Sequence, residues 1–527
     1  MSLIAAIDQG TTSTRIIVFD GSFNVVASAQ LEHRQITPKP GWVEHNPLEI
    51  IEVIGRLQEM IAEKLQAQGL SLSQIAGVGI TNQRETTVVW DRFTGRPLHN
   101  AVVWLDTRTH ETMAKLARTC SKDAFREKTG LPIASYFSGL KLRWLIDNVP
   151  AVREAARDGR CLFGTIDTWL IWTLTGGPEG GVHVTDVTNA SRTMIFNIHT
   201  LQWDEEICRQ LEIPMGVLPQ VRSSSEVYGR FAQGPFKGIP IAGCLGDQQS
   251  ALVGQKAFTC GEAKNTYGTG CFLLMNMGER PMTSKHGLLT TVAYKLGPHA
   301  PVHYAFEGSV AIAGAAVKWL GDNMGLIPSP RDIGPLASSV PDTGGVYFVP
   351  AFSGLFAPRW REDARGLVIG MSQFTTKAHV ARAVEEAICF QTREVLEAME
   401  QDSGVKLRLL RVDGGASEDG FLMQWQADLL GTQVVRPACV ETTAMGTAFA
   451  AALATGFCTS TADIETRTAS HLAQRFTPAI TEKVRERAWR CWNRAVERSI
   501  GWLDLTTDPE VEDDEHHPSP EVPRKHD

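Results

Sequence analysis

The sequence lacks the best-known signatures of nucleotide-binding proteins. It contains no Walker A sequence (GxxxxGK followed by Ser or Thr), no Gly-rich loop with the HRD and DFG segments of protein kinases, and no GxGxxG that opens a helix. These absences exclude a P-loop site, a protein-kinase site and a Rossmann dinucleotide site. Any phosphoryl transfer by this chain must therefore use a different scaffold.

Cysteine motifs and long hydrophobic runs are also absent. None of the ten cysteines stands at CxxC spacing or pairs with a histidine at zinc-finger spacing, which favours free thiols in a reducing, cytoplasmic compartment. No basic segment followed by an apolar one opens the chain, so no secretory signal is predicted. The longest uncharged stretch, 442–462, is rich in Ala, Gly, Thr and Ser and predicts a buried helix, not an integral membrane segment.

Net charge is small and unevenly distributed. The 51 Lys and Arg residues stand against 59 Asp and Glu residues, which gives −8. Eight acidic and two basic residues fall in 508–527, so this segment carries −6 and the other 507 residues carry −2. The tail holds four prolines and almost nothing apolar, which predicts disorder. The negative balance also argues against a nucleic-acid partner, because binding phosphates needs clustered Lys and Arg.

Length and composition predict a multidomain globular protein. At about 100–200 residues per domain, 527 residues give at least two domains, each large enough for its own core. A content of 43% hydrophobic and 21% charged residues excludes collagen-like, fully disordered and disulfide-scaffold proteins.

Both halves of the chain contain short apolar strands around polar, Gly-containing turns. The pattern predicts strands at 3–7, 16–19, 24–29, 75–81, 86–90, 271–275 and 407–412, and a helix at 48–68. The likeness of the two halves suggests a duplicated α/β architecture with a boundary near 248–260. Two unrelated α/β domains explain the pattern equally well at this point.

The first candidate site is the segment 8–15 (DQGTTSTR), directly after the first apolar strand. A glycine lets the backbone approach a phosphate, and the Thr and Ser hydroxyls and turn N–H groups can donate to phosphate oxygens. Asp8 at the strand end can reach a hydrated Mg²⁺, and Arg15 adds a cation. A plain turn is the alternative, but the position after the first strand favours phosphate binding.

Two further Asp/Gly turns follow apolar strands. Asp247 comes after the strand at 239–245 and before a helix-like stretch at 250–255, so it suits a helix N-cap or a catalytic carboxylate. The residues alone favour the cap. Asp413 precedes two glycines that would let a flat ligand such as adenosine lie against the backbone, and a β-turn is an equally good interpretation.

Together the three turns resemble the phosphate-and-adenosine pattern of the α/β, two-lobed actin-like ATPase (ribonuclease H-like) fold. Longer stretches resemble the FGGY carbohydrate kinase family, and within it the members that phosphorylate glycerol. The matching stretches are 80–90, 163–172, 184–194, 246–249 and 264–272. Residues 136–148 match the first family signature, and 366–386 approximate the second, with Glu385 where an aliphatic residue is usual. The resemblance covers residues 3–503.

This resemblance implies ATP-dependent phosphorylation of glycerol to sn-glycerol 3-phosphate, with Mg²⁺. Arg84 and Glu85 would hold the glycerol hydroxyls, and Asp247 would act as the catalytic base. A site built on buried polar groups rejects substrates that lack a hydroxyl far better than an apolar pocket does. The further implied substrate contacts are Tyr136, Asp247 and Gln248, with Trp104 and Phe272 as an aromatic wall.

On the nucleotide side, the resemblance implies that Asp8 places Mg²⁺. The implied phosphate contacts are Thr11, Thr12, Ser13, Arg15 and Thr269, and Gly314 and Gly415 would line the adenosine site. Two outer contacts depart from the usual pattern: Lys318 stands where bacterial enzymes often have Gln, and Asp419 where Asn is usual. The second change removes a donor and adds a charge.

The implied organisation is an N-terminal domain at 1–252 that binds glycerol and phosphate, a nucleotide-binding domain at 253–505, and the disordered acidic tail at 506–527. A closing cleft between duplicated domains and a homo-oligomer, dimer or tetramer, are further implications. A kinase for another small polyol or a pentulose is the same-class alternative. A non-catalytic nucleotide or polyol sensor would be expected to lose the metal or base carboxylate, yet Asp8 and Asp247 are both present. An actin-type filament protein would not need Arg84, Glu85 and Asp247 together.

Overall fold

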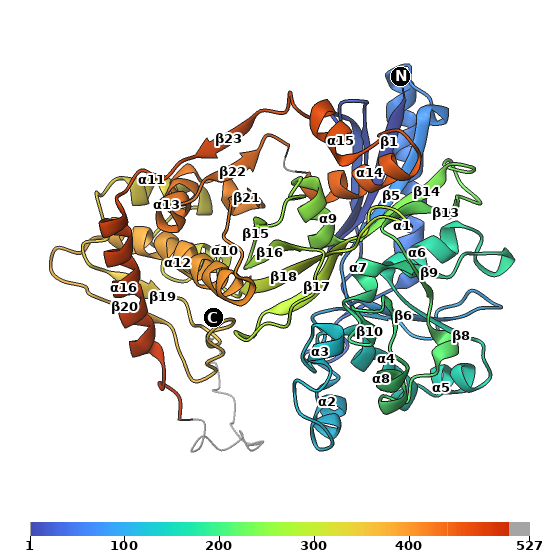
Figure 1. Ribbon diagram of the computed structural model, residues 1–527, viewed down its shortest axis with the longest axis horizontal. Coiled ribbons are helices and arrows are strands. Elements are labelled where there is room, and N and C mark those ends of the chain that lie inside the picture. The colour runs from blue at the N-terminus through green and yellow to red at the C-terminus, as the bar shows by residue number, and fades with distance from the viewer. Residues whose placement is uncertain (1, 440, 505–527) are drawn as a thin grey trace, which may run out of the picture.

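The computed structural model describes residues 2–439 and 441–504. The predicted tail at 506–527 lies outside this part of the chain. The described chain forms two lobes, which Figure 1 shows in blue to green for the N-terminal half and in yellow to red for most of the C-terminal half.

A six-stranded sheet forms the centre of the N-terminal lobe, in the order β3-β2-β1-β5-β14-β13. Its strands are β1 (Leu3–Gln9), β2 (Ser13–Phe19), β3 (Val25–Glu32), β5 (Ile75–Asn82), β13 (Ser225–Arg230) and β14 (Pro240–Gly246). β1 is buried along its whole length, as its apolar run predicts.

A seven-stranded sheet forms the centre of the C-terminal lobe, in the order β17-β18-β16-β15-β21-β22-β23. Its strands are β15 (Glu262–Tyr267), β16 (Cys271–Gly278), β17 (Leu289–Tyr294), β18 (His303–Val310), β21 (Leu409–Asp413), β22 (Val434–Pro437) and β23 (Ala473–Phe476).

The two sheets share one arrangement of six strands, to which the C-terminal sheet adds β17 at its edge. In each, an antiparallel meander (β3-β2-β1 and β18-β16-β15) is followed by two parallel strands (β5-β14 and β21-β22) and an antiparallel edge strand. Asp8 pairs with Thr81 across β1 and β5, and Thr266 pairs with Asp413 across β15 and β21. The duplicated α/β architecture is confirmed, and the alternative of two unrelated domains is wrong. The polar turns meet where parallel strands end, the usual place for ligands in such sheets.

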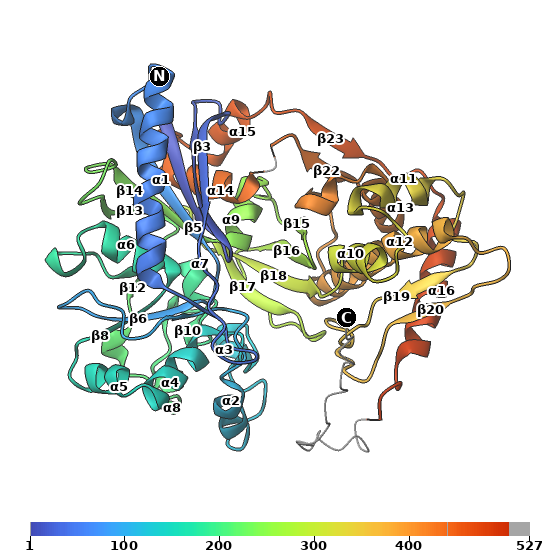
Figure 2. The ribbon, with the colours of Figure 1, turned by 180° about the vertical axis from the view of Figure 1, so that it is seen from behind.

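The helix predicted at 48–68 is α1 (Pro47–Ala67). The Asn46 side chain accepts from the N–H of Leu48, and Pro47 stands in the first turn, so the sequence specifies the start of this helix. Apolar residues including Ile50, Ile54 and Leu57 lie buried at helical spacing. Figure 2 shows α1 in front of the N-terminal sheet, whose outer face it covers.

The remaining helices and smaller strands complete both lobes. The longer helices are α4 (Ser138–Asn148), α6 (Ile166–Leu174), α9 (Asp247–Gly254), α10 (Gly314–Asp322), α12 (Lys377–Ser403), α13 (Gly420–Leu430), α14 (Thr442–Ala454) and α16 (Glu482–Ser499). The shorter ones are α2 (His110–Ala117), α3 (Arg126–Thr129), α5 (Pro150–Arg157), α7 (Val187–Ala190), α8 (Glu205–Gln210), α11 (Ile333–Ser338) and α15 (Thr461–Arg467). The smaller strands are β4 (Glu44–His45), β6 (Thr87–Asp91), β7 (Ala101–Val102), β8 (Cys161–Thr165), β9 (Val184–Asp186), β10 (Phe196–Asn197), β11 (Gln202–Trp203), β12 (Gln220–Arg222), β19 (Tyr347–Val349) and β20 (Leu367–Ile369).

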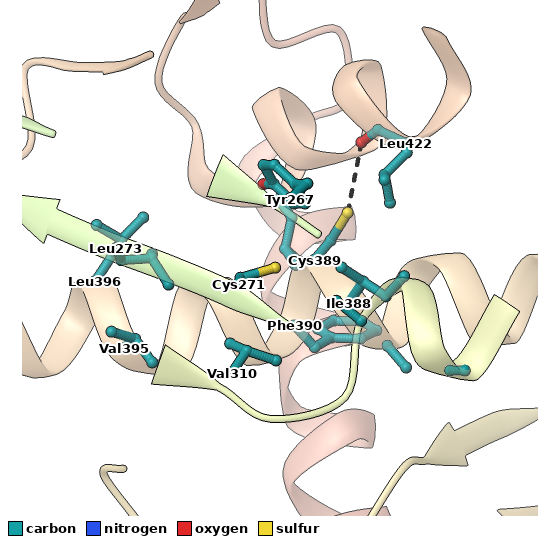
Figure 3. Packing of buried hydrophobic residues seen from close by; sticks show 14 of the residues in the cluster. Tyr267, Cys271, Leu273, Val310, Ile388, Cys389, Phe390, Val395, Leu396 and Leu422 are labelled. Carbon is teal, nitrogen blue, oxygen red and sulfur yellow. Dashed lines mark hydrogen bonds between the residues drawn. The ribbon is translucent and has the colours of Figure 1, made fainter. Parts of the chain in front are cut away.

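Helix α12 is the centre of the C-terminal core. Figure 3 shows Phe390 and Leu396 of α12 packed with Leu273 of β16 and Val310 of β18. The Cys389 thiol donates to the carbonyl of Leu422 on α13 at 3.5 Å, so even this buried thiol has a partner. All ten cysteines are free.

Helix α14 joins the two lobes. It belongs to the C-terminal half but packs on α9 and on the N-terminal sheet, as Figure 1 shows. Two glycines permit a close approach of the two helices. A Cβ at Gly254 would lie 1.9 Å from the carbonyl oxygen of Thr442, and one at Gly446 would lie 1.8 Å from that of Ser250, so a larger residue would clash at either position. This contact fixes α9, which begins with Asp247.

The prediction of a buried helix over 442–462 is right about burial and wrong about extent. α14 ends at Ala454, and Gly456 adopts a left-handed φ of 71° before α15 begins. Among the described helices, none combines the length and apolar character that crossing a membrane requires.

Candidate active site

The Arg-Glu pair after β5 is buried, so it is not a surface ion pair. Arg84 is 3% exposed and Glu85 is 1% exposed, in the turn between β5 and β6. Glu85 has a φ of 60°, a left-handed conformation that costs a non-glycine residue free energy. Strained backbone and buried charge in the same turn are typical of a functional site.

Two residues that the sequence analysis missed hold this pair. Glu307 of β18 accepts from Nη1 and Nη2 of Arg84 at 2.6 and 3.0 Å, although 223 positions separate the two residues in the chain. Arg192, just after α7, donates through Nε to Glu85 at 2.5 Å and through Nη2 to Glu307 at 3.1 Å. We call Arg84, Glu85, Arg192 and Glu307 the four-charge network; each is at most 3% exposed.

The two neighbouring arginines keep the carboxyl group of Glu307 ionised. Burial alone would raise the pKa of Glu307, but Arg192 and Arg84 outweigh it and hold the pKa at about 2. Burial raises the pKa of Glu85, and Arg192 opposes that shift. The sequence signal for Glu307 was a single charged residue within an otherwise apolar strand, after Tyr304-Ala305-Phe306.

Asp247 lies at the junction of β14 and α9. Gly246 is the N-cap and Asp247 is the first helical residue, so the interpretation of Asp247 as the N-cap is wrong. Its Oδ1 accepts from the N–H of Gln248 at 2.7 Å and lies 3.2 Å from Nε of Arg84. Burial raises the pKa of Asp247, while Arg84 and then Lys264 oppose the shift. The side chain remains 32% exposed, so a ligand can reach it.

Lys264 of β15 is a further residue that the sequence analysis did not assign. It is fully buried, and its Nζ donates to Oε1 of Gln248 and, at 3.0 Å, to Oγ1 of Thr266. Burial lowers the pKa of Lys264 to about 8, against the opposing charge of Asp413. Lys264 thus brings positive charge from the C-terminal lobe to Asp247 and Gln248.

The predicted aromatic wall connects the substrate residues to the phosphate turn. The rings of Trp104 and Tyr136 meet edge to face at 5.7 Å, and Trp104 Nε1 donates to Oγ1 of Thr11 at 2.9 Å. Lys141, fully buried on α4, donates to the carbonyls of Ser135 and Tyr136 and so fixes the Tyr136 backbone. Phe272 stands apart from these contacts on β16, where it is paired in register with Ser309.

The turn after β1 presents hydroxyls and a held cation. Thr11 and Ser13 are half-buried and Thr12 is exposed. Oδ2 of Asp8 accepts from Nε of Arg15 at 2.8 Å, and Nη1 of Arg15 pairs with Glu441 at the start of α14. Arg15, which is predicted to contact phosphates, is therefore paired with one carboxylate from each half of the chain. Burial raises the pKa of Asp8, and Arg15 opposes that shift.

The nucleotide residues predicted in the C-terminal lobe fall into two groups. The carbonyl of Thr269 accepts from the N–H groups of Ala313 and Ala315 at 2.9 and 3.0 Å, which fastens the turn to the start of α10 beside Gly314. A Cβ at Gly415 would have no heavy atom within 4 Å, so this residue faces open space.

Lys318 and Asp419 are more peripheral. Lys318 is exposed and forms an i,i+4 pair with Asp322 on α10. The carboxylate of Asp419 accepts from the N–H groups of Phe421 and Leu422 at 2.7 and 3.1 Å, so it caps α13. Its side chain is thereby turned toward the helix. Direct contacts among the predicted residues thus form three groups: Arg84 with Asp247 and Gln248, Trp104 with Tyr136 and Thr11, and Asp8 with Arg15. Within the described part of the chain, Lys318 and Asp419 contact none of these groups through a hydrogen bond or ion pair.

One group of three possible metal ligands occurs among the described residues, and it is not the predicted magnesium site. Asp167, Asp186 and Cys244 place ligand atoms within 4.8 Å of one another. Protein donors already surround both carboxylates, including Thr185 at 2.7 Å from Asp167 and Ser224 at 2.8 Å from Asp186. The group is therefore satisfied without an ion.

Comparisons with known proteins identify the family of this chain. Residues 3–254 match the N-terminal domain of the FGGY family of carbohydrate kinases, and residues 263–455 match its C-terminal domain. A glycerol kinase from Brucella anthropi is 56% identical over 95% of this chain and 99% of its own length. One from Chloroflexus aurantiacus is 57% identical, with the same coverage.

Solved structures show the same relationship. Plasmodium falciparum glycerol kinase, determined with ADP, superimposes with a TM-score of 0.90 at 40% identity, over 96% of this chain and 99% of its own. A xylulose kinase from Lactobacillus acidophilus shares the fold, with a TM-score of 0.82 at 22% identity over 94% and 98% of the two chains. This chain belongs to the FGGY family of carbohydrate kinases.

Proposed function

We propose that this chain transfers the γ-phosphoryl group of ATP to a terminal hydroxyl of glycerol and produces sn-glycerol 3-phosphate. The observation that carries the proposal is the buried arrangement of Arg84 and Glu85 beside Asp247, with Arg84 Nε 3.2 Å from the Asp247 carboxylate. This arrangement offers donors and acceptors to several hydroxyl groups at once, which a small triol requires. Glycerol kinases from Brucella anthropi and Chloroflexus aurantiacus, each more than half identical to this chain, also support the proposal.

Asp247 is the base in this proposal. It takes the proton of the terminal hydroxyl while that oxygen forms a bond to the γ-phosphorus, and the bond from the γ-phosphorus to the β–γ bridging oxygen breaks to release ADP. A carboxyl pKa raised by burial improves proton acceptance, which supports this role. Because phosphoryl-transfer transition states are loose, alignment and charge stabilisation supply most of the acceleration.

The remaining residues align the reactants. Arg84 and Glu85 bind the glycerol hydroxyls, Tyr136 and Gln248 add polar contacts, and Trp104 and Phe272 cover the carbon atoms. Trp104 also donates to Thr11, so a hydrogen bond links the wall of the substrate pocket to the phosphate turn. Thr11, Thr12, Ser13, Arg15 and Thr269 bind phosphate oxygens, and Gly314, Lys318, Gly415 and Asp419 stand around the nucleoside.

The residues near Asp8 fit a magnesium ion. Both Arg15 bonds to Asp8 end on Oδ2, which leaves Oδ1 without a partner among the described residues and free for a hydrated ion. Mg²⁺ usually takes one or two carboxylates and keeps several waters, so Asp8 would suffice as its protein ligand. When bound with ATP, the ion neutralises phosphate charge.

A substrate panel tests the reaction. We expect kcat/KM for glycerol to exceed that for pentuloses and for other small polyols by at least about 100-fold, because unmatched hydroxyls would leave buried polar groups unpaired. ATP consumption coupled to ADP detection measures this. Preference for a pentulose or another polyol would favour a different kinase of the family, and nucleotide binding without turnover would favour a sensor.

We also propose a cytoplasmic location and a homo-oligomer, dimer or tetramer. Ten free cysteines support a reducing compartment. Exposed apolar side chains in the C-terminal lobe, such as Phe374 (70%) and Met371 (62%), support a self-association surface. Light scattering coupled to gel filtration checks the assembly, and a monomer at micromolar concentration would contradict it.

A further inference from the structure

Glu307 reaches from one lobe into the substrate pocket of the other. Its backbone belongs to β18, between β16 and β17, where it pairs with Leu274 and Leu289. Figure 1 shows β17 and β18 extending from the C-terminal lobe toward α7, and β17 contacts α7. The Glu307 carboxylate nevertheless binds two arginines of the N-terminal lobe, Arg84 and Arg192.

We propose that Glu307 is a positioning residue for glycerol: it orients Arg84 directly and, through Arg192, orients Glu85 and Tyr136. The glycerol pocket is thus built on the N-terminal lobe but takes its anchoring carboxylate from the C-terminal lobe. This inference rests on the proposed function, because it assigns Arg84, Glu85 and Tyr136 to glycerol.

Donor counting on Arg84 supports this role. A guanidinium has five N–H donors in a rigid plane. Nε faces Asp247 at 3.2 Å, Nη1 donates to Glu307 at 2.6 Å and to Gln249 at 3.3 Å, and Nη2 donates to Glu307 at 3.0 Å. The second N–H of Nη2 is left without a protein partner among the described residues. The bidentate bond to Glu307 therefore fixes the plane of the Arg84 guanidinium and leaves one N–H of Nη2 for a substrate hydroxyl.

Arg192 carries the effect of Glu307 to the other side of the pocket. It is fully buried and binds Glu307 through Nη2 and Glu85 through Nε. Its guanidinium carbon lies 5.9 Å from the centre of the Tyr136 ring and 5.5 Å from that of Phe137. Nη1 of Arg192 is buried and has no hydrogen-bond partner among the described residues, so the aromatic faces are the neighbours measured beside this guanidinium. One carboxylate thus sets the position of three predicted glycerol contacts.

The charge of Glu307 also acts on Asp247. The four-charge network is neutral as a whole, with two arginines and two glutamates. Removing the Glu307 charge leaves Arg84 with more net positive potential toward Asp247, which favours the ionised carboxylate and lowers the Asp247 pKa. Of the other charged groups near Asp247, Lys264 and Asp8, Lys264 is also coupled to Glu307: losing that carboxylate lowers the pKa of Lys264, which lies at about 8. The acidic limb falls below that pH, where Lys264 stays protonated, so the limb reports the effect of Arg84 on Asp247.

The test compares Glu307→Gln with Glu394→Gln in the full-length chain. Glu394 is a buried carboxylate of the same lobe, 7% exposed, that accepts from Arg359 and from Trp492 at 2.7 Å and takes no part in the four-charge network. For Glu307→Gln we expect glycerol KM to rise about 10- to 100-fold, ATP KM to stay within about twofold, and the acidic limb of the kcat/KM pH profile to move to lower pH. For Glu394→Gln we expect a lower melting temperature with glycerol KM and pH limb unchanged.

Two further variants keep the test decisive if Glu307→Gln does not fold. Glu307→Asp keeps the charge but shortens the side chain by one methylene group. Arg192→Lys keeps the charge but loses the planar guanidinium that binds Glu85 and Glu307 through separate nitrogens. Each should raise glycerol KM selectively and leave the pH limb near its wild-type position. Equal changes in both KM values, or a change in melting temperature alone, would overturn the role of Glu307. A wild type that does not phosphorylate glycerol would overturn the proposed function itself, and this inference with it.

Discussion

The glycerol side and the nucleotide side of this site are built by different means. On the glycerol side, charged side chains are buried and paired with one another, and no member of the four-charge network is more than 3% exposed. On the nucleotide side, Asp8 and Arg15 form a partly buried pair beside the predicted phosphate site, but the predicted nucleoside residues differ: Gly415 faces open space and Lys318 pairs with Asp322 at the surface. We therefore expect buried charges to select the substrate, and backbone and free space to accommodate the nucleoside.

The largest expected effect comes from the carboxylate at the boundary of the two sides. Asp247→Asn removes the base, and we expect kcat to fall by about 10²- to 10⁴-fold because general-base catalysis contributes roughly that factor. Glycerol binding measured by calorimetry should change far less, since the amide keeps the shape. Asp20→Asn, at an exposed turn between β2 and β3, is the matched control and should leave kcat unchanged. Near-normal turnover by Asp247→Asn would reject Asp247 as the base.

A second change fills space on the nucleotide side without touching any charge. Gly415→Val places a side chain where a Cβ meets no heavy atom within 4 Å. If adenosine occupies this space, we expect ATP KM to rise by about tenfold or more, a loss of at least roughly 1.4 kcal/mol, with unchanged glycerol KM and melting temperature. Gly55→Ala, which also has open space but lies within α1, should leave ATP KM unaltered. Unchanged ATP KM in Gly415→Val would place the nucleoside elsewhere.

A third change tests the ion pair between Arg15 and Glu441. Glu441 pairs with Arg15 from the start of α14 and adds a negative charge beside the predicted phosphate site. Glu441→Gln releases Arg15 from this pair and removes a repulsion, so we expect ATP KM to fall by about two- to fivefold. Initial rates against ATP at saturating glycerol measure the effect. A rise in ATP KM would mean that Glu441 orients Arg15 toward phosphate.

The smallest expected effect is at Lys318. Its side chain is 72% exposed and its pair with Asp322 is a surface ion pair, which contributes little. Lys318→Ala should therefore change ATP KM by less than about twofold, again from initial rates. A tenfold change would show that nucleoside binding depends on an individual charge, and it would weaken the contrast between the two sides.

Local sequence patterns predicted most of the fold. The apolar run at 75–81 corresponds to β5 (Ile75–Asn82), and the helical spacing at 48–68 corresponds to α1. The duplication could be suspected because each half places a Gly- and Thr-rich turn after a strand. The docking of α14 on the N-terminal sheet could not be predicted, since it depends on a close approach at Gly254 and Gly446.

The sequence predicted some residues of the candidate site and missed others. Asp8, Arg84, Glu85 and Asp247 follow strands, so their positions can be inferred from pattern and resemblance. Arg192 and Glu307 act through contacts that span 107 and 223 positions, and Lys264 reaches its partners from within a strand. Strand and turn patterns report local geometry, and such patterns do not specify which distant charges meet after folding.

Titration of glycerol into the protein without nucleotide, followed by calorimetry, shows whether protein side chains alone complete the glycerol pocket. Because side chains from both lobes pair with one another in the four-charge network, we expect one glycerol to bind per chain in the absence of ATP. Binding that is detected only after a nucleotide is added would reject this role of Glu307, since the nucleotide would then complete the pocket.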